Sequence, residues 1–569
     1  DLLESDEKAF DSFKFANNSI AWQQVHYKWA ASNAEKGEVE GRAPKEPVYE
    51  GEEPKWYLFQ IAFILMNLES IANPNSTYRE TVDLLWFPTG GGKTEAYLGL
   101  VAFTLAYRRL RGANDAGEIT SESLGTAVIM RYTLRLLTVQ QFQRAATLMC
   151  ACEKLRLEDT PKWGEVPFQV GLWVGAGVTP NTRNEAKSQQ WKLRNSKEKS
   201  LTSIKTKNPY ILINCPWCGK ELKYSDGSVC GQPQQWRLFC SRGGSSACLF
   251  SKHLEDDPDV SIPVVLVDDD IYSRCPSLII ATVDKFAQIA WKPEVKSVFG
   301  KVSHHCEQHG FFDRAISDDS HKHNNKKPDP VKLLPPEMII QDELHLISGP
   351  LGTLTGLYET AIEYLCNNGD IKPKIIASTA TTRAAEDQIR TLFARDDTRV
   401  FPPQIATFGE TFFSRVNHDK AGKAYVGVLA TGKSGLTVLA KVSAVILRRI
   451  RQFEEDEEYE KEDLDPYFTL VTYFNSQREL GGASMNFKDS VPNFIQQIQN
   501  NFDDSPVLPP ITENGMELTV EESEKVEGTT PETQSEEAKK QKTKWKKALR
   551  PYQFWELVTD ELTSRKSAG

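Results

Sequence analysis

A glycine-rich loop between an apolar strand pattern and a helical pattern is the feature that most limits how this chain can fold. Residues 82–87 read as a short buried strand, and residues 95–111 read as a helix. The loop between them runs Phe87-Pro88-Thr89-Gly90-Gly91-Gly92-Lys93-Thr94. A loop of this kind binds phosphate when its backbone N–H groups and the start of the following helix face the same oxygens. The sequence therefore predicts an α/β domain with a phosphate-binding loop.

The residue types in this loop suit a nucleotide and its magnesium ion. Lys93 would reach the β- and γ-phosphates, and the hydroxyl of Thr94 would ligate Mg²⁺. The other residues expected to surround the nucleotide phosphates are Thr89, Gly90, Gly91 and Gly92. The general pattern has a glycine where this chain has Phe87. A purely structural glycine turn is the alternative, but the Lys-Thr pair at the required spacing favours an ATP site.

Apolar strand patterns alternate with helical patterns along much of the chain, which indicates a parallel α/β sheet. The further candidates for buried strands are residues 126–130, 170–174, 277–282, 337–341 and 374–378. A new strand pattern at 466–474 predicts that a second α/β unit begins there.

Composition divides the chain into four parts. Residues 1–50 are polar with scattered aromatics and are expected to form a helical lead-in. The other predicted parts are a main domain at 51–400 with a basic, cysteine-bearing insertion at about 187–262, a connector with an acidic linker at 401–465, and the start of the second unit at 466–569. Residues 515–540 lack periodicity and are predicted to be disordered.

Bulk composition excludes several classes of protein. The 569 residues carry 68 basic and 78 acidic side chains, a net charge of −10, so the chain is not a uniformly basic nucleic-acid coat. No apolar run approaches the roughly 18 residues that span a bilayer, so we expect no membrane association. Ten cysteines are too few for a disulfide scaffold, which favours the cytoplasm. Because the chain begins at Asp1 rather than Met, we expect the natural N-terminus to lie upstream.

Adjacent carboxylates follow the strand pattern at 337–341. Asp342 at the end of such a strand would join the Mg²⁺ shell, and Glu343 would orient the attacking water. His345 would couple the state of the nucleotide to neighbouring motifs. The alternative is an ordinary acidic loop, which the phosphate loop elsewhere in the chain makes the weaker interpretation.

Four cysteines in the insertion have the composition of a zinc site. Cys215 and Cys218 form a Cys-x-x-Cys knuckle, and Cys240 and Cys248 follow 22 and 30 residues after Cys218. Four thiolates suit tetrahedral Zn²⁺, and the metal would help to fold a small polar insert. Cys230 is a possible substitute ligand. Unliganded thiols and a redox Cys-x-x-Cys are the alternatives.

Two basic segments have two interpretations each. Residues 187–207 carry seven basic side chains against the single acid Glu198, and residues 539–550 hold a basic run around Trp545. Basic residues with an embedded aromatic suit phosphate neutralisation and base stacking. A solvated helix face is the other interpretation, and the sequence does not separate the two.

The ordered set of motifs resembles the superfamily 2 helicases of DExH type. The phosphate loop resembles their first motif, and Asp342-Glu343-Leu344-His345 resembles their second. The resemblance implies two RecA-like lobes, with only the beginning of the second lobe in this chain. It also implies roles for further residues: Phe59 and Gln60 at adenine, Thr133, Arg135, Thr282 and Lys285 on the DNA backbone, and Ser378, Thr379 and Thr381 in coupling.

More narrowly, residues 86–97, 132–138 and 341–352 are similar to the helicase-like subunits of DISARM anti-phage defence systems. The resemblance implies a bacterial ATP-driven DNA motor that works with a DrmB-like partner subunit and a DNA methyltransferase. The arginine motif Gln-x-x-Gly-Arg-x-x-Arg, with which such motors complete the ATP site, does not occur in this sequence. A nucleotide-gated DNA-binding scaffold is therefore the alternative to a processive motor, and an ATPase that acts on protein is a third.

Overall fold

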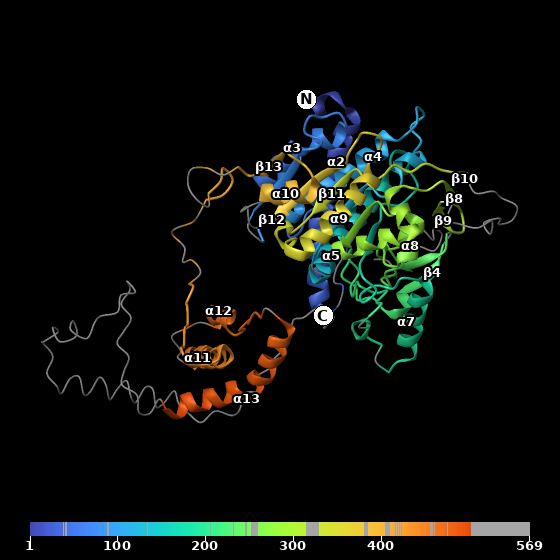
Figure 1. The fold of residues 1–569 in the computed structure, drawn as a ribbon. Coiled ribbons are helices and arrows are strands. Elements are labelled where there is room, and N and C mark those ends of the chain that lie inside the picture. Colours follow the sequence, from blue (N-terminus) through green and yellow to red (C-terminus); the bar gives the residue numbers. More distant parts are fainter. Residues whose placement is uncertain are drawn as a thin grey trace, which may run out of the picture. The chain divides into compact units, whose positions relative to one another are not determined.

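The structure is a computed structural model, and it forms two compact units that are described separately (Figure 1). The first spans residues 1–418, and the second begins at residue 419. The residues described are 1–501 without 38, 40–42, 88–89, 134, 198, 205, 232, 245–246, 252–259, 314–328, 380–384, 404, 406–409, 416, 418, 420–421, 423, 456–458, 460 and 475. The predicted disorder at 515–540, the basic run at 539–550, Thr89 and Thr381 lie outside the described residues.

An all-parallel sheet of eight strands forms the centre of the first unit. In sheet order the strands are β13 (Thr398–Phe401), β1 (Val82–Trp86), β12 (Lys374–Thr379), β11 (Met338–Gln341), β2 (Val128–Tyr132), β7 (Leu278–Thr282), β3 (Val170–Trp173) and β6 (Val264–Val265). The six predicted strands are all present, which confirms the expected α/β class with a RecA-like parallel sheet. The two edge strands were not predicted, because four residues or fewer give too little pattern.

Helices cover both faces of this sheet. Side chains of β2 alternate between the two layers: Val128 and Met130 point toward one apolar cluster and Ile129 toward the other. The helices of the first layer are α2 (Glu7–Lys36), α3 (Leu58–Ala72), α4 (Lys93–Arg111) and α5 (Arg135–Glu158). The second layer contains α8 (Asp268–Arg274), α9 (Gly349–Cys366) and α10 (Ala385–Phe393). This arrangement leaves the carboxyl edge of the sheet for the loops that follow the strands.

The segment at 1–50 is helical, as predicted, but it is part of the core. A short helix α1 (Leu2–Ser5) precedes α2, which packs against α4 and α5. Phe15 and Trp22 of α2 are buried in the first apolar layer. The N-terminal segment therefore stabilises the nucleotide-binding domain directly.

The cysteine-bearing insertion is compact and lies between β3 and β7 in the sequence. It contains α7 (Arg183–Asn195) and a hairpin of β4 (Gly227–Cys230) with β5 (Gln235–Leu238). A small antiparallel sheet farther along the chain pairs β8 (His304–Cys306) with β9 (Gly310–Phe312) and β10 (Asp329–Pro330). These additions leave the order of the parallel strands intact.

The described part of the second unit is helical. Helices α11 (Gly435–Glu455) and α13 (Gln477–Asn501) pack together through Ala440, Ala444 and Val491, and α12 (Lys461–Leu464) lies between them in sequence. The strand predicted at 466–474 is wrong: a 3-10 turn, Asp465–Tyr467, is followed by unpaired chain. Its apolar side chains are exposed, as at Tyr473, and no neighbouring strand supplies ladder hydrogen bonds. Within the described residues, no helix is long and apolar enough to cross a membrane.

Candidate nucleotide site

Three neighbouring strands bring the predicted phosphate and magnesium residues to one edge of the sheet. The phosphate loop follows β1, the acidic box follows β11, and β12 lies between these two strands. Strand register aligns Trp86 with Thr379 and Gln341 with Ala377. Because all strands run in parallel, the residues just beyond their carboxyl ends meet in one place. The two motifs, about 250 positions apart in the sequence, therefore share a site.

The phosphate loop is held from behind by α3. Gly90 and Gly92 have φ values of +83° and +89°, which glycine adopts at no steric cost. The amide of Gln60 donates to the carbonyl of Gly92 at 2.8 Å and accepts from the backbone N–H of Tyr57 at 2.8 Å. The ring of Phe59 stacks on Phe87 with centroids 4.1 Å apart. The adenine-binding role of Phe59 and Gln60 stays a prediction, since here they fix the loop.

Lys93 begins α4 and is largely buried beside the acidic box. Its Nζ donates to the carbonyl of Phe87 at 2.7 Å. Burial lowers the pKa of Lys93, and the nearby carboxylates of Glu343 and Asp342 oppose this shift. A cation held close to two carboxylates and a ring of backbone N–H groups is suited to a phosphate chain.

A tyrosine that the sequence analysis missed joins the two predicted magnesium ligands. The hydroxyl of Tyr97 lies 3.1 Å from that of Thr94 and donates to Oδ2 of Asp342 at 2.8 Å. Ser378 donates to the other carboxylate oxygen, Oδ1, which also accepts from the N–H of Glu343 at 2.9 Å. The available signal was spacing, because Tyr97 follows Thr94 by three positions on α4 and shares its face.

Glu343 and His345 lie beside this network on the loop after β11. Glu343 has φ +49°, a left-handed conformation that is uncommon for a residue with a Cβ and frequent at functional loops. Burial raises the pKa of Glu343, the neighbouring Asp342 adds to the rise, and Lys93 opposes it. His345 Nδ1 lies 3.0 Å from the hydroxyl of Thr379 and 3.4 Å from Glu343. A basic carboxylate is thus connected to the end of β12.

The four predicted backbone-contact residues have different environments. Thr133 follows β2 and is half-buried, and the side chain of Arg135 lies outside the described atoms. Thr282, at the end of β7, is fully buried. Lys285 is also buried, and its Nζ binds Asp268 at 2.7 Å and the carbonyl of Val174 at 3.0 Å. In this structure Thr282 and Lys285 therefore stabilise the domain interior and do not present a surface to DNA, since burial and the ion pair occupy them.

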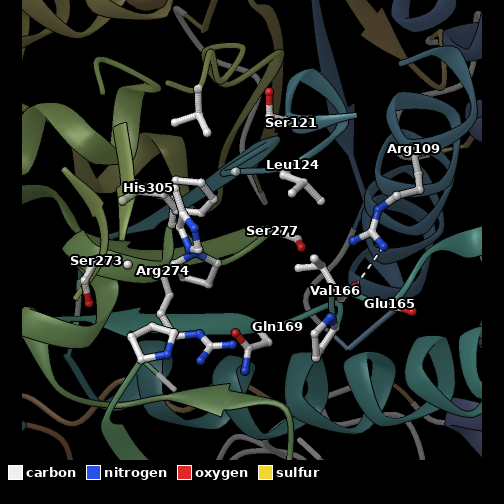
Figure 2. A pocket seen from close by; sticks show the side chains of 18 residues that line it. Arg109, Ser121, Leu124, Glu165, Val166, Gln169, Ser273, Arg274, Ser277 and His305 are labelled. Carbon is white, nitrogen blue, oxygen red and sulfur yellow. Dashed lines mark hydrogen bonds between the residues drawn. The ribbon is translucent and has the colours of Figure 1, made fainter. Parts of the chain in front are cut away.

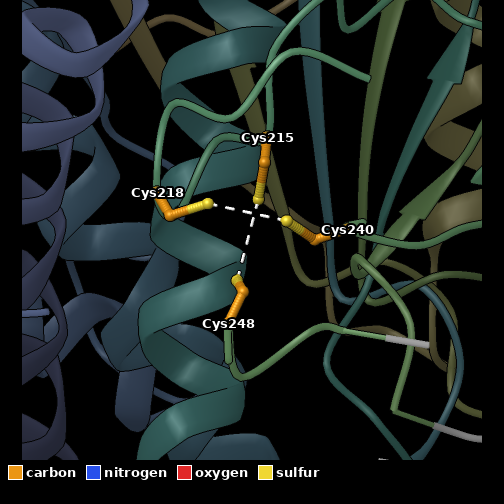
Figure 3. Close-up of side chains that lie close together, drawn as sticks. All are labelled: Cys215, Cys218, Cys240 and Cys248. Carbon is orange, nitrogen blue, oxygen red and sulfur yellow. Dashed lines mark hydrogen bonds between the residues drawn. The ribbon is translucent and has the colours of Figure 1, made fainter. Parts of the chain in front are cut away.

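The four predicted zinc cysteines converge, as Figure 3 shows. All four sulfur atoms lie within 4.8 Å of one another, with Cys215 and Cys248 3.9 Å apart and Cys218 and Cys240 3.5 Å apart. Zn–S bonds of about 2.3 Å in a tetrahedron place sulfur atoms about 3.8 Å apart. The donor set therefore fits a structural Zn²⁺. Cys230, the possible substitute, is not part of this group.

Helix α2 packs directly against the cysteine knuckle. The ring of His26 stacks on Trp217, with centroids 3.3 Å apart, and Nδ1 of His26 lies 2.7 Å from the Trp217 carbonyl. Asn33 donates to the carbonyl of Cys218 at 3.0 Å. A Cβ at Gly219 would lie 2.2 Å from the carbonyl oxygen of Ala30, so only glycine permits this contact. The metal site and the N-terminal helix are therefore one structural element.

A separate cavity of about 360 Å³ lies at the opposite edge of the sheet (Figure 2). Its lining includes Gly125, Gln169 and Ser277, which precede β2, β3 and β7. Arg109 lines it too, but its guanidinium donates to the carbonyls of Trp163 and Val166. The cavity is therefore distinct from the nucleotide site, which lies beyond the carboxyl ends of the strands.

Comparisons with known proteins agree with the resemblance expected from the sequence. No family model matches the chain. Among solved structures, the DUF1998 helicase MrfA is 9% identical with a TM-score of 0.34, and MrfA bound to DNA and AMPPNP is 10% identical with a TM-score of 0.35. These alignments cover 80% and 79% of this chain and 40% of each MrfA chain.

A much closer similarity is found in Bacillus paralicheniformis. Its DISARM protein DrmA is 40% identical over 514 residues, which is 88% of this chain. The chain spans 44% of the length of that relative. By this identity and coverage, the chain is a helicase-like relative of DISARM protein DrmA.

Proposed function

We propose that this chain is the nucleotide-binding part of an ATP-driven DNA motor in a bacterial anti-phage defence system. The observation that carries the proposal is the convergence of Lys93, Asp342 and Glu343 at the carboxyl edge of neighbouring parallel strands. The similarity to DISARM protein DrmA supports the defence role and a cytoplasmic location. Because the chain spans less than half of that relative, the activity of a whole protein is part of the proposal.

Each group in the site would have one task in ATP hydrolysis. The loop N–H groups and Lys93 would bind the β- and γ-phosphates, and Thr94 with Asp342 would hold Mg²⁺. The magnesium ion, when bound, supplies charge neutralisation to the phosphates. Glu343 would orient the attacking water and accept its proton, for which its raised pKa is suited. Gln60 would read adenine after releasing the carbonyl of Gly92.

Coupling to DNA would run along β12 to the segment that follows it. His345 contacts Thr379, and Ser378 donates to Asp342, so a change at the metal ligands would be felt at the end of this strand. Thr381 would extend that path. Thr133 and Arg135, at the start of the segment after β2, would contact the DNA backbone. We further propose a DrmB-like subunit and a DNA methyltransferase as partners, and a structural Zn²⁺ on the four cysteines.

DNA-stimulated ATP hydrolysis tests the enzymatic proposal. The parent chain, within the longest available protein that contains it, should hydrolyse ATP faster with DNA. Lys93→Ala should abolish nucleotide binding, and Glu343→Gln should bind ATP but reduce turnover by about 10²-fold or more. Lys372→Ala, a lysine paired with Glu80 at 2.8 Å, is the matched control and should leave turnover unchanged. Undiminished turnover in both site variants would refute these roles.

A nucleotide-gated DNA-binding scaffold is the second candidate function. The absence of the Gln-x-x-Gly-Arg-x-x-Arg motif from the sequence favours it, because a motor needs that charge at the transferred phosphate. A scaffold would show DNA affinity that depends on the bound nucleotide but would displace no annealed strand. A motor would displace strands in the same buffer.

A further inference from the structure

The outward face of α7 combines exposed basic side chains with an exposed tryptophan. Trp191 is 67% exposed, which is unusual for so large an apolar side chain. Lys187, four positions before it, and Arg194, three positions after it, are exposed as well. Positions i, i+4 and i+7 lie along one side of a helix, so the three side chains form one stripe. Lys192 and Lys197 add exposed positive charge beside it.

The opposite face of α7 is firmly attached to the domain. Ala186 and Leu193 are buried, and the amide of Gln190 donates to the carbonyl of Tyr224 at 2.9 Å. At the start of the helix, Nε of Arg183 binds Oδ1 of Asp270 on α8 at 2.5 Å. The basic stripe is therefore presented by a fixed helix, and the charges that secure the helix are not those of the stripe.

The topology places α7 after the same edge of the sheet as the nucleotide site. The chain leaves the carboxyl end of β3 at Trp173 and enters α7 at Arg183. β3 is the neighbour of β7, which in turn is the neighbour of β2, and the segment after β2 holds Thr133. A strand of nucleic acid that crosses this edge would have α7 within the same side of the domain.

We propose that the Lys187–Trp191–Arg194 stripe of α7 binds single-stranded DNA. Charge complementarity supports a polyanion, since cations in a row neutralise successive phosphates. The exposed indole supports a single strand, because only unpaired bases offer an open face for stacking. The inference deepens the proposed function, because it adds a DNA-contact surface separate from the residues that bind nucleotide.

Fluorescence anisotropy with a labelled oligo-dT strand, without nucleotide, tests the stripe in the full chain. Trp191→Ala should weaken binding about tenfold through lost stacking, and Trp191→Phe should retain most of the affinity. The double variant Lys187→Ala/Arg194→Ala should reduce the slope of log affinity against log salt by about 1.4, because about 0.7 is expected for each phosphate on a single strand.

The matched control changes one aromatic and one basic residue on another helix. Tyr27→Ala/Lys28→Ala on α2 removes an exposed tyrosine and an exposed lysine and should leave both affinity and slope unchanged. Binding of a fluorescent ATP analogue should be equal in all variants, since α7 is outside the nucleotide site. That second readout separates the stripe from the proposed function, which Lys93→Ala tests by itself.

Three results would overturn the inference. The first is equal oligo-dT affinity and salt slope in the parent and all stripe variants. The second is no binding of oligo-dT by the parent, whatever its ATP affinity. The third is binding of vesicles with anionic lipid, or of duplex DNA, that depends on the stripe more strongly than oligo-dT binding does. An RNA strand of the same length that binds as tightly would support the stripe while assigning it to single-stranded nucleic acid of both kinds.

Discussion

The hydroxyl of Tyr97 donates to Oδ2 of Asp342 at 2.8 Å and lies 3.1 Å from the hydroxyl of Thr94. Both predicted magnesium ligands are thus engaged by one side chain that is 1% exposed. Burial and the charge of Asp342 raise the pKa of Tyr97 well above its ordinary value, so the phenol is a neutral donor. Tyr97 therefore positions the carboxylate and competes with a cation for it.

Tyr97→Phe should have opposite effects on stability and on magnesium affinity. Loss of the hydroxyl leaves a buried carboxylate oxygen without its donor, which should lower the free energy of unfolding by about 1–2 kcal/mol. The same loss frees Asp342, so ATP turnover should reach half its maximum at a lower Mg²⁺ concentration. Thermal unfolding and a magnesium titration of ATP hydrolysis measure the two effects.

The control for this variant lies on the same helix. Tyr107 of α4 donates to Oδ2 of Asp6 at 2.8 Å, far along the helix from the phosphate loop. Tyr107→Phe should lower stability by a similar amount without changing the magnesium dependence. An unchanged magnesium dependence in Tyr97→Phe as well would show that the hydroxyl has only a structural role.

Gly92→Ala should abolish nucleotide binding. The new Cβ would lie 2.8 Å from the amide nitrogen of Gln60, at a backbone φ of +89° that costs a non-glycine residue about 1 kcal/mol or more. The loop would have to move away from α3. Gly117→Ala has a similar φ of +81° but no atom within 4 Å, so it should bind a fluorescent ATP analogue normally. Equal affinity in both variants would contradict the close contact.

Metal analysis should find about one zinc ion per chain, held by the four-cysteine group. Cys218→Ser should lose the metal and lower the thermal stability of the domain, because α2 packs on the knuckle through His26. A chelator should have the same effect on the parent. Cys230→Ser is the matched control and should keep its zinc, and metal loss in that variant would assign the site to different cysteines.

Asp270 should make stability depend on pH in the acid range. Burial raises the pKa of Asp270 to about 6, against the opposing effect of Arg183. The folded state therefore binds this proton more tightly than the unfolded state, so the stabilising contribution is full below about pH 4 and is lost as the pH rises through about 6. Relative to the parent, Asp270→Asn should gain on the order of 3 kcal/mol between pH 4 and 7.

Thermal unfolding at several pH values measures this difference, and Asp11 provides a control of opposite sign. A hydrogen bond from Lys162 lowers the pKa of Asp11, so its stabilising contribution is present above the ordinary pKa and is lost on acidification. Asp11→Asn should therefore lose ground to the parent as the pH rises. Parallel pH profiles of Asp270→Asn and the parent would mean that Asp270 is not titrating in this window.

Local pattern was enough to predict the central strands and the phosphate loop. Buried parallel strands read as short apolar runs, and a loop with Lys93 and Thr94 at fixed spacing needs only adjacent residues for its chemistry. The cysteine knuckle was predictable for the same reason, since ligand type and spacing state the metal. The strand at 466–474 was wrong because a strand also needs a paired neighbour, which no local pattern reports.

The sequence by itself determined which residues have phosphate, carboxylate and thiolate chemistry, because those properties belong to single side chains and short spacings. Only the tertiary structure decided which of them act together. Strand order brought Asp342 to the phosphate loop and placed Tyr97 between the predicted metal ligands. Burial removed Lys285 from the surface by pairing it with Asp268 and left Trp191 exposed among cations. The physical reason is that burial and pairing depend on contacts between segments that lie far apart in the chain.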